Sequence, residues 1–364
     1  MDIFPKFALE VRKLVLMIEI ENEGIRKIPQ EDLSLDIREK MITQDRFKSI
    51  SNRFKDRKVL IVGDVMLDRY YYGQTNRMSP EAPVPIVDID NTIDNPGGSS
   101  NVALNIAMLG ATPLICGIVG DDTDGEILKD QLRNDNVATD FIFKDSIRPT
   151  TVKSRIISKD HQLVRMDKES SAEISEELNS SIIDSISDAI QEVDGLILQD
   201  YNKGLLNPSN ISRILEIAIK HEIPVYVDPK HQNFPLYNNV RLFKPNFAEF
   251  INFNTELGDF ETTGFAFKDK INCEILMVTK GADGVSLFYE SDHSQIATKA
   301  RKVHDVSGAG DTVISAFCLS DLCEASPSES AYISNYAAGR VCEEVGVVPI
   351  QQSMLNEIID HLDH

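Results

Sequence analysis

The spacing of hydrophobic and polar positions changes at about residue 58. From there on, short continuous apolar runs alternate with amphipathic stretches of helical period. The apolar runs lie at 59–62, 114–119, 196–198, 225–227 and 275–278, and the amphipathic stretches at 102–109, 182–190 and 211–219. Continuous apolar strands separated by helices indicate a mostly parallel sheet with helices on both faces. We therefore predict an α/β fold.

Two stretches depart from this rhythm. Residues 70–89 and 141–167 are rich in aromatic and β-branched residues that alternate with polar ones, and they show little helical period. Each follows a strand and a helix of the predicted main sheet. We expect both to leave that sheet as hairpins, pair into a small β-sheet and act as a lid.

The domain boundaries follow from these patterns. Residues 1–54, with a predicted helix at 44–54, are interpreted as a helical or partly disordered N-terminal extension without an assigned function. One large domain is expected over residues 55–350, including the lid at about 70–89 and 141–167. Residues 351–364 are expected to form a C-terminal helix or tail.

Charge and cysteine content narrow the partners and the location. The 364 residues include 58 acidic and 37 basic side chains, for a net charge of −21, which argues against nucleic acid or an anionic membrane as the main partner. The five cysteines are scattered without a Cys-x-x-Cys pair, which is typical of a reducing compartment. The apolar run at 14–18 is too short to cross a bilayer. We expect a cytoplasmic protein.

The sharpest motif is Asp-Val-Ser-Gly-Ala-Gly-Asp-Thr at 305–312, directly before an apolar helical run. Its two glycines allow a tight turn that presents backbone N–H groups at the positive end of a helix, which favours an anion. Asp311 is anomalous in such a site unless it accepts a proton from an attacking hydroxyl, as phosphoryl transfer requires. A simple capped helix start explains the spacing equally well.

A second glycine pair opens the predicted helix at 102–109, in the segment Pro-Gly-Gly-Ser-Ser-Asn at 96–101. Paired glycines permit close approach of a ligand, and Asn101 offers a donor and an acceptor, as sugar hydroxyls require. No Gly-x-Gly-x-x-Gly follows the first strand, which disfavours NAD, and no glycine precedes a lysine, so a Walker P-loop is absent.

Polar residues also follow several predicted strands. Asp200 and Lys203, the Asp-Pro-Lys at 228–230, the Lys-Pro-Asn at 244–246 and the Thr-Lys-Gly at 279–281 stand at consecutive strand ends, where open α/β sheets bind ligands. The histidines show no metal-ligand spacing, so no metal other than magnesium is supported.

These motifs together resemble the ribokinase/PfkB carbohydrate kinases over roughly residues 55–350. The glycine pair with Asn101 resembles the family's first signature, and residues 305–311 its second, with Ser307 where the family often has Thr. Five further segments, at 63–70, 79–85, 200–204, 227–230 and 244–249, are similar to the kinase part of bacterial D-glycero-β-D-manno-heptose 7-phosphate kinases, which act in ADP-heptose synthesis for lipopolysaccharide.

The resemblance implies a ribokinase-like fold and ATP-dependent phosphorylation of the sugar's anomeric C1 hydroxyl, with Mg²⁺. It implies Asp311 as the base and an anion hole at Gly308, Ala309 and Gly310. The implied nucleotide site comprises Asn246, Glu249, Thr279, Lys280, Gly281, Gly284 and Asn335, with Glu249 organising magnesium indirectly. The implied sugar site comprises Asp68, Gly97, Gly98 and Asn101, and Asp305 and Ser307 resemble positions that bind a monovalent cation such as K⁺ in some relatives.

The substrate's 7-phosphate would need cations. By chemistry, the candidates are Lys153, Arg155 and Arg165 on the lid and Lys203 and Lys230 on the main sheet. Exposed apolar lid residues would suit a homodimer formed through the lid. Two alternatives stay open: a kinase of the same family for another sugar, sugar phosphate or nucleoside, and a non-catalytic sugar- or nucleotide-binding sensor.

Overall fold

A computed structural model describes residues 42–159, 161–254, 258–298, 306–344 and 346–360. The chain divides into two units, Met1–Met41 and Ile42–His364. The predicted N-terminal extension therefore lies outside the described residues as far as position 41, and all the described helices and strands belong to the second unit.

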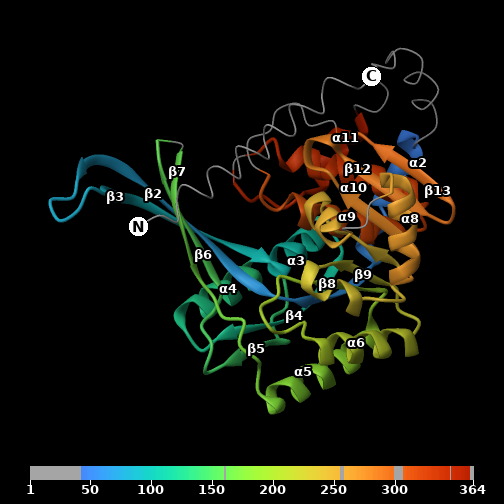
Figure 1. Ribbon diagram of the computed structural model, residues 1–364, viewed down its shortest axis with the longest axis horizontal. Coiled ribbons are helices and arrows are strands. Elements are labelled where there is room, and N and C mark those ends of the chain that lie inside the picture. The colour runs from blue at the N-terminus through green and yellow to red at the C-terminus, as the bar shows by residue number, and fades with distance from the viewer. Residues whose placement is uncertain (1–41, 160, 255–257, 299–305, 345, 361–364) are drawn as a thin grey trace. The chain divides into compact units, whose positions relative to one another are not determined.

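The described part of the second unit contains a nine-stranded sheet in the order β13-β12-β11-β10-β9-β8-β1-β4-β5 (Figure 1). Its strands are β1 (Lys58–Gly63), β4 (Thr112–Gly120), β5 (Ile142–Asp145), β8 (Gly195–Gln199), β9 (Val225–Asp228), β10 (Leu242–Phe243), β11 (Ile275–Thr279), β12 (Val285–Tyr289) and β13 (Asp292–Ile296). All neighbours from β5 to β11 pair in parallel, and β12 and β13 add an antiparallel edge. The predicted mostly parallel α/β sheet is confirmed.

Helices cover both faces of this sheet. They are α2 (Gln44–Ser51), α3 (Ser99–Met108), α4 (Thr123–Asn134), α5 (Glu176–Ala189), α6 (Pro208–Lys220), α7 (Phe247–Phe253), α8 (Phe260–Ile271), α9 (Ala309–Leu322), α10 (Pro327–Val341) and α11 (Gln352–Asp360). On one face Leu198 packs in a cluster with Ile186 of α5 and Ile214 of α6. On the other face Tyr226 of β9 donates a hydrogen bond to Asp321 of α9 at 2.7 Å. Burial on both sides explains why these strands are continuously apolar.

The small sheet contains four strands in the order β3-β2-β6-β7. They are β2 (Val65–Met78), β3 (Pro85–Gly98), β6 (Val152–Ser158) and β7 (His161–Lys168). In Figure 1 these blue and green strands run side by side at the left. The predicted lid boundaries need one correction: β5 lies within the predicted span 141–167, but it pairs with β4 in the large sheet. Its alternating pattern identified a strand and left its pairing partner undetermined.

Both ends of the described unit pack against its core. Phe47, Ile50 and Phe54 are fully buried, so residues 42–54 belong to this unit, whereas the sequence analysis placed them in the extension. Leu355 of α11 is also fully buried, and a helix near the C-terminus was expected. Among the described helices, none combines the length and the apolar character that crossing a membrane requires.

Candidate active site

A cleft of about 560 Å³ lies at the carboxyl ends of the parallel strands. It is lined by residues that follow β8, β9, β10 and β11, and by the start of α9 and one face of α10. The strand-end motifs of the sequence thus meet at one edge of the sheet, as the rule for open α/β sheets predicts.

The start of α9 forms the end of this cleft. Gly308 caps the helix in the left-handed region, with φ of 80°, and a Cβ atom at this position would lie 2.8 Å from Nδ2 of Asn101. Only glycine fits both the backbone conformation and the close approach. Ala309 and Gly310 line the cleft, and Asp311 stands in the first helical turn.

The carboxylate of Asp311 is 5% exposed and bonded at both oxygens. Asn101 Nδ2 donates a hydrogen bond to Oδ2 at 2.7 Å. Gln199 Nε2 and the Tyr201 hydroxyl donate to Oδ1 at 3.0 and 3.1 Å. Three donors from two distant parts of the chain therefore fix the orientation of this side chain.

Burial raises the pKa of Asp311 to about 7. The hydrogen bond from Asn101 opposes this shift, and the negative charge of Asp228 adds to it. A carboxyl group with this pKa is a much stronger base than an ordinary aspartate, whose pKa is about 3.9. A pKa near the working pH is what a general base requires.

A buried ion pair lies beneath the cleft. Lys244 is 3% exposed, and its Nζ contacts Asp228 Oδ2 at 2.9 Å, while Gln199 Nε2 donates to the same carboxylate at 3.1 Å. A Cβ atom on Gly310 would lie 3.6 Å from the Lys244 ammonium, so this cation stands beside the glycine turn. Sequence reasoning noted the motifs containing Lys244 and Asp228 but did not select these residues, and it missed Gln199 and Tyr201. The feature that could have identified Lys244 is a lysine directly after a buried strand, at the sheet edge where ligands bind.

The predicted sugar-site residues come together on the other side of Asp311. Gly97 lies in β3, and a Cβ atom there would collide with Oδ2 of Asp68 on the neighbouring strand β2, so glycine lets the two strands pass this carboxylate. Gly98 adopts φ of 58° and leads into α3, whose first turn carries Asn101. Asp68 and Gly97 thus lie against each other, and Gly98 leads into the helix whose Asn101 bonds to the Asp311 carboxylate, 210 positions away in the sequence.

Six of the seven predicted nucleotide-site residues line the cleft: Asn246, Glu249, Thr279, Gly281, Gly284 and Asn335. Lys280 differs, because its ammonium lies over the ring of Phe260, 4.3 Å from the centroid, and is outside the cleft lining. Burial there lowers its pKa.

Asn246 and Glu249 form a capping box at the start of α7. The Asn246 side chain accepts from the Glu249 amide at 2.8 Å, and the Glu249 carboxylate accepts from the Asn246 amide at 3.2 Å. The other oxygen of Glu249 accepts from Lys230 Nζ at 2.9 Å. The described residues contain no group of three or more metal-ligating side chains. This arrangement fits an indirectly held Mg²⁺, because that ion keeps several waters and binds through one or two carboxylates and the substrate's phosphates.

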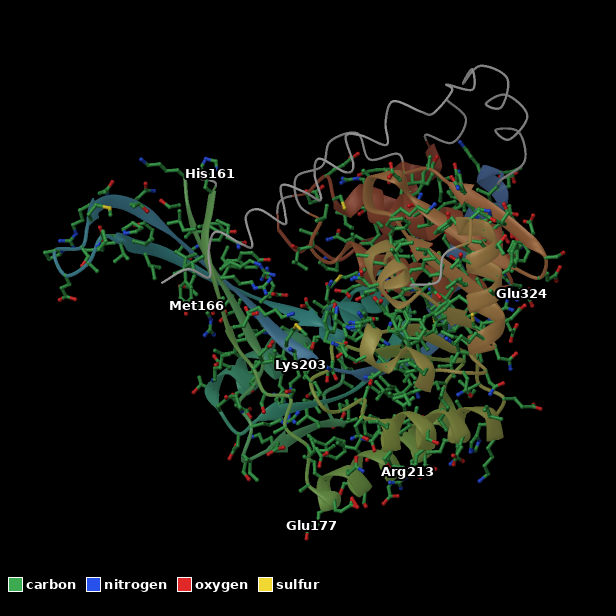
Figure 2. All side chains as sticks on the ribbon, viewed as in Figure 1. His161, Met166, Glu177, Lys203, Arg213 and Glu324 are labelled. Atoms are coloured by element: carbon green, nitrogen blue, oxygen red, sulfur yellow. The ribbon has the colours of Figure 1, made fainter. Side chains whose placement is uncertain are left out.

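The five predicted phosphate-binding cations separate into three groups. Arg155 Nη1 contacts Asp68 Oδ1 at 2.5 Å, and Lys153 Nζ lies 5.1 Å from the centroid of the Tyr201 ring, so both reach the sugar side. Lys230 lies instead on the nucleotide side with Glu249. Arg165 pairs with Asp167 on β7, and Lys203 pairs with Glu169 at 2.7 Å. In Figure 2 Lys203 lies near the centre of the view, and Met166 and His161 lie along β7.

The predicted monovalent-cation residues are incompletely described. Asp305 lies outside the described residues, and Ser307 stands in the turn before α9. This assignment stays a prediction.

Comparison with known proteins assigns this architecture to a class. The profile described as "pfkB family carbohydrate kinase" matches residues 56–353, so the chain belongs to this family of phosphotransferases. Among its relatives are the bifunctional proteins HldE of Koribacter versatilis, 36% identical over 319 residues, and of Haemophilus ducreyi, 37% identical over 316 residues. These alignments cover 86% and 85% of this chain and 65% of each relative, so the chain spans about two thirds of their length.

Solved structures share the fold. Phosphofructokinase-2 from Escherichia coli, in complex with substrates and products, superposes with a TM-score of 0.71 at 18% identity, covering 85% of this chain and 100% of that one. Ribokinase from Arabidopsis thaliana, complexed with ribose and ATP, gives 0.65 at 18% identity, covering 83% and 98%. The predicted ribokinase-like fold is thereby confirmed.

Proposed function

We propose that the protein transfers the terminal phosphoryl group of ATP to the anomeric C1 hydroxyl of D-glycero-β-D-manno-heptose 7-phosphate, which gives the 1,7-bisphosphate. The observation that carries the proposal is the Asp311 carboxylate, held by Asn101, Gln199 and Tyr201 beside a glycine turn at a helix N-terminus. A base and an anion-binding turn at one point are what phosphoryl transfer to a hydroxyl requires.

Asp311 accepts the proton of the C1 hydroxyl in this reaction. Its pKa of about 7 makes it a competent acceptor near neutral pH. Because phosphoryl transfer passes through a loose transition state, the proton leaves late, and the carboxylate's first task is to align the oxygen with the phosphorus.

The transferring group is stabilised by groups of the cleft floor. The backbone amides of Gly308, Ala309 and Gly310 lie at the positive end of α9, and the Lys244 ammonium stands beside them. Donors that are fixed before the reaction stabilise developing charge without reorganisation cost, which is a large contribution to catalysis.

ATP occupies the cleft in this proposal. Glycines 281 and 284 allow close approach at one wall, Asn335 of α10 stands at the adenine end, and Asn246 and Glu249 face the phosphates. Glu249 would hold Mg²⁺ indirectly, through water and the phosphates, and the ion would supply positive charge at the transferring group.

The sugar phosphate lies between Asp311 and the small sheet. The Asp68 carboxylate accepts hydrogen bonds from sugar hydroxyls, and the Asn101 amide offers both a donor and an acceptor. Lys153 and Arg155 are the cations within reach of a remote phosphate. The resemblance to heptose 7-phosphate kinases in five segments, together with these two cations, favours a phosphorylated heptose over an unphosphorylated sugar. The small sheet acts as a lid that excludes water.

The lid also suits a homodimer. Seven of its apolar side chains are exposed, namely Met78, Val84, Ile89, Ile93, Leu163, Val164 and Met166. We propose that a second copy of the chain covers them. The remaining expectations, a K⁺ ion near Ser307, a cytoplasmic location, and no nucleic-acid or membrane partner, accompany this proposal.

Two other functions lead to different measurements. A pfkB kinase for another sugar would not need Lys153 and Arg155 for a second phosphate. A non-catalytic sensor would not need the base, yet Asp311 is present next to the cleft-lining Gly310, and Glu249 lines the cleft.

An ADP-release assay with a panel of sugars and sugar phosphates tests the proposal. We expect the heptose 7-phosphate to give the highest kcat/KM, with formation of a 1,7-bisphosphate. Preferential turnover of an unphosphorylated sugar would support the first alternative. ATP binding without turnover of any acceptor would support the second.

A further inference from the structure

The loop that follows β8 is held by two buried carboxylates that have no part in the mechanism above. Asp64, at the end of β1, is 5% exposed and accepts hydrogen bonds from the backbone amides of Tyr201 and Lys203, each at 3.0 Å. Asp200 accepts from the Asn202 amide at 2.7 Å. Burying two negative charges is costly unless hydrogen bonds compensate them. The amides that donate to these carboxylates therefore hold the backbone of this short loop in one conformation.

Tyr201 connects this loop to the base. Its hydroxyl donates to Asp311 Oδ1 at 3.1 Å, and its ring lies under the Lys153 ammonium of β6 at 5.1 Å from the centroid. The residue therefore contacts the catalytic carboxylate at one end and a cation of the lid across its ring. Asp64 is outside the cleft lining, and its side chain is linked to Asp311 through the backbone of this loop, while its backbone bonds to Ser99 and Gln199.

We propose that Tyr201 is a positioning residue that holds the Asp311 carboxylate in its reactive orientation, and that Asp64 holds Tyr201 in place through its backbone amide. This inference rests on the proposed function of Asp311 as the base. Gln199 donates to the same oxygen of Asp311, so loss of the phenol leaves one donor there and frees the carboxylate to rotate.

The charge state of Asp311 reports on this contact. The titratable groups that face it are Tyr201, Asp228 of β9 and Lys244 after β10. A donated hydrogen bond stabilises the ionised carboxylate, so the phenol lowers the pKa of Asp311 against the effect of burial. Removing the hydroxyl therefore raises that pKa further.

The test is Tyr201→Phe, which keeps the ring under Lys153 and removes only the hydroxyl. We expect kcat to fall about tenfold, in line with the loss of a hydrogen bond to a charged group. We expect KM for both substrates to stay within about twofold, and the acid limb of the pH profile to move to higher pH. Asp64→Asn, which weakens the acceptor for the loop amides, should shift the profile in the same direction by less.

Tyr226→Phe is the matched control. It also removes a buried phenol that donates to a carboxylate, but this carboxylate belongs to Asp321 at the opposite end of α9 from Asp311, and neither residue lines the cleft. We expect a comparable loss of thermal stability and an unchanged pH profile. An equal shift of the profile in this variant would overturn the proposal.

A measurement without turnover separates this proposal from the function on which it rests. The Asp311 carboxyl carbon, labelled with ¹³C and assigned by its loss in Asp311→Asn, is titrated by NMR in the substrate-free protein. A higher midpoint in Tyr201→Phe and an unchanged one in Tyr226→Phe support the positioning role even if no sugar phosphate in the panel is turned over. An unchanged midpoint in Tyr201→Phe, with or without a loss of kcat, overturns it.

Discussion

The floor of the cleft and the outer part of the small sheet differ in how deeply their side chains are buried and in where their bonding partners come from. Asp311, Gln199 and Lys244 on the floor are at most 5% exposed, and each bonds to a partner from another element. On β7, by contrast, every residue is exposed, and Arg165 bonds to Asp167 two residues away on the same strand. The chain alone preorganises the chemical groups, whereas the outer lid lacks packing partners within the described unit.

This difference assigns distinct tasks to the two regions. Preorganised donors and a buried base lower the barrier of the chemical step, so changes on the floor should appear in kcat. Exposed cations on a strand gain binding energy only when a substrate desolvates them, so changes on the lid should appear in KM. Substitutions in each region test that division.

Asp311→Asn should have the largest effect. We expect kcat to fall about 10³-fold, within the range of general acid–base contributions, with ATP affinity largely retained, as measured by ADP release and calorimetry. Asp292→Asn on the exposed β12–β13 hairpin is the matched control and should leave both quantities unchanged. Turnover of Asp311→Asn close to that of the unchanged protein would refute its role as base.

Arg155→Gln should have the next largest effect, because Arg155 is the lid cation bonded beside the sugar site. We expect KM for the heptose 7-phosphate to rise about 10- to 100-fold, the worth of a charge-assisted hydrogen bond, with a smaller change in kcat. Steady-state kinetics over a range of sugar phosphate concentrations measures both.

Arg165→Gln sharpens the same comparison. Arg165 stands opposite Arg155 in the β6–β7 register but is half-exposed and paired with Asp167. We expect KM to change less than about threefold, as is usual for an exposed ion pair. Equal effects of the two substitutions would mean that β7 closes over the substrate phosphate, and the division between floor and outer lid would fail.

Val164→Asp tests the proposed lid dimer. Val164 is 45% exposed on β7, so the substitution should cost little in the monomer, but a charge without a partner in an interface is destabilising. We expect at least a tenfold weaker dimer by sedimentation, on the order of the cost of an unpaired buried charge. A monomer both before and after the substitution would refute the proposed lid dimer.

The smallest expected effect concerns stability against pH. Burial raises the pKa of Asp311 to about 7 and that of Asp64 to about 6, so the folded state binds their protons more tightly than the unfolded state does. Their contribution is fully present below about pH 4 and is lost as pH rises through these values. As pH rises from about 5 to 8, we expect the free energy of unfolding, measured in urea, to fall less in Asp311→Asn than in the unsubstituted protein. The difference is on the order of 1 kcal/mol.

Much of the fold was readable from the sequence. Buried parallel strands are continuous apolar runs, so the runs at 59–62 and 196–198 were predicted within a residue or two of β1 and β8. Residues 142–145 were recognised as extended but given to the wrong sheet, because a strand's pattern specifies its exposed and buried faces and not its neighbour.

The site was predictable only where chemistry lies in one short segment. The glycine turn with Asp311 and the Asn-x-x-Glu element were found in this way, and their backbone geometry follows from local rules. The donors from Gln199 and Tyr201 to Asp311 join positions 112 and 110 residues apart, and no local pattern encodes such contacts. Lys280 was predicted to border the nucleotide together with its neighbours; these line the cleft, while its own side chain lies over Phe260.

The short distance between β1 and β2 determines how the small sheet moves. β2 begins at Val65, two residues after β1 ends, and Asp64 between them is anchored on both its backbone and its side chain, so this connection has no slack for a hinge. Further out, the pairing of β2 with β3 slips at Tyr72/Gly73 and again at Thr75/Arg77. Such irregularities bend and twist a strand pair locally. We therefore expect the tip of the ribbon to bend while Asp68, at its root, stays paired with Asn95 of β3 and Lys153 of β6. In the proposed reaction, a sugar would then be enclosed or released without disturbing the groups that orient its hydroxyls.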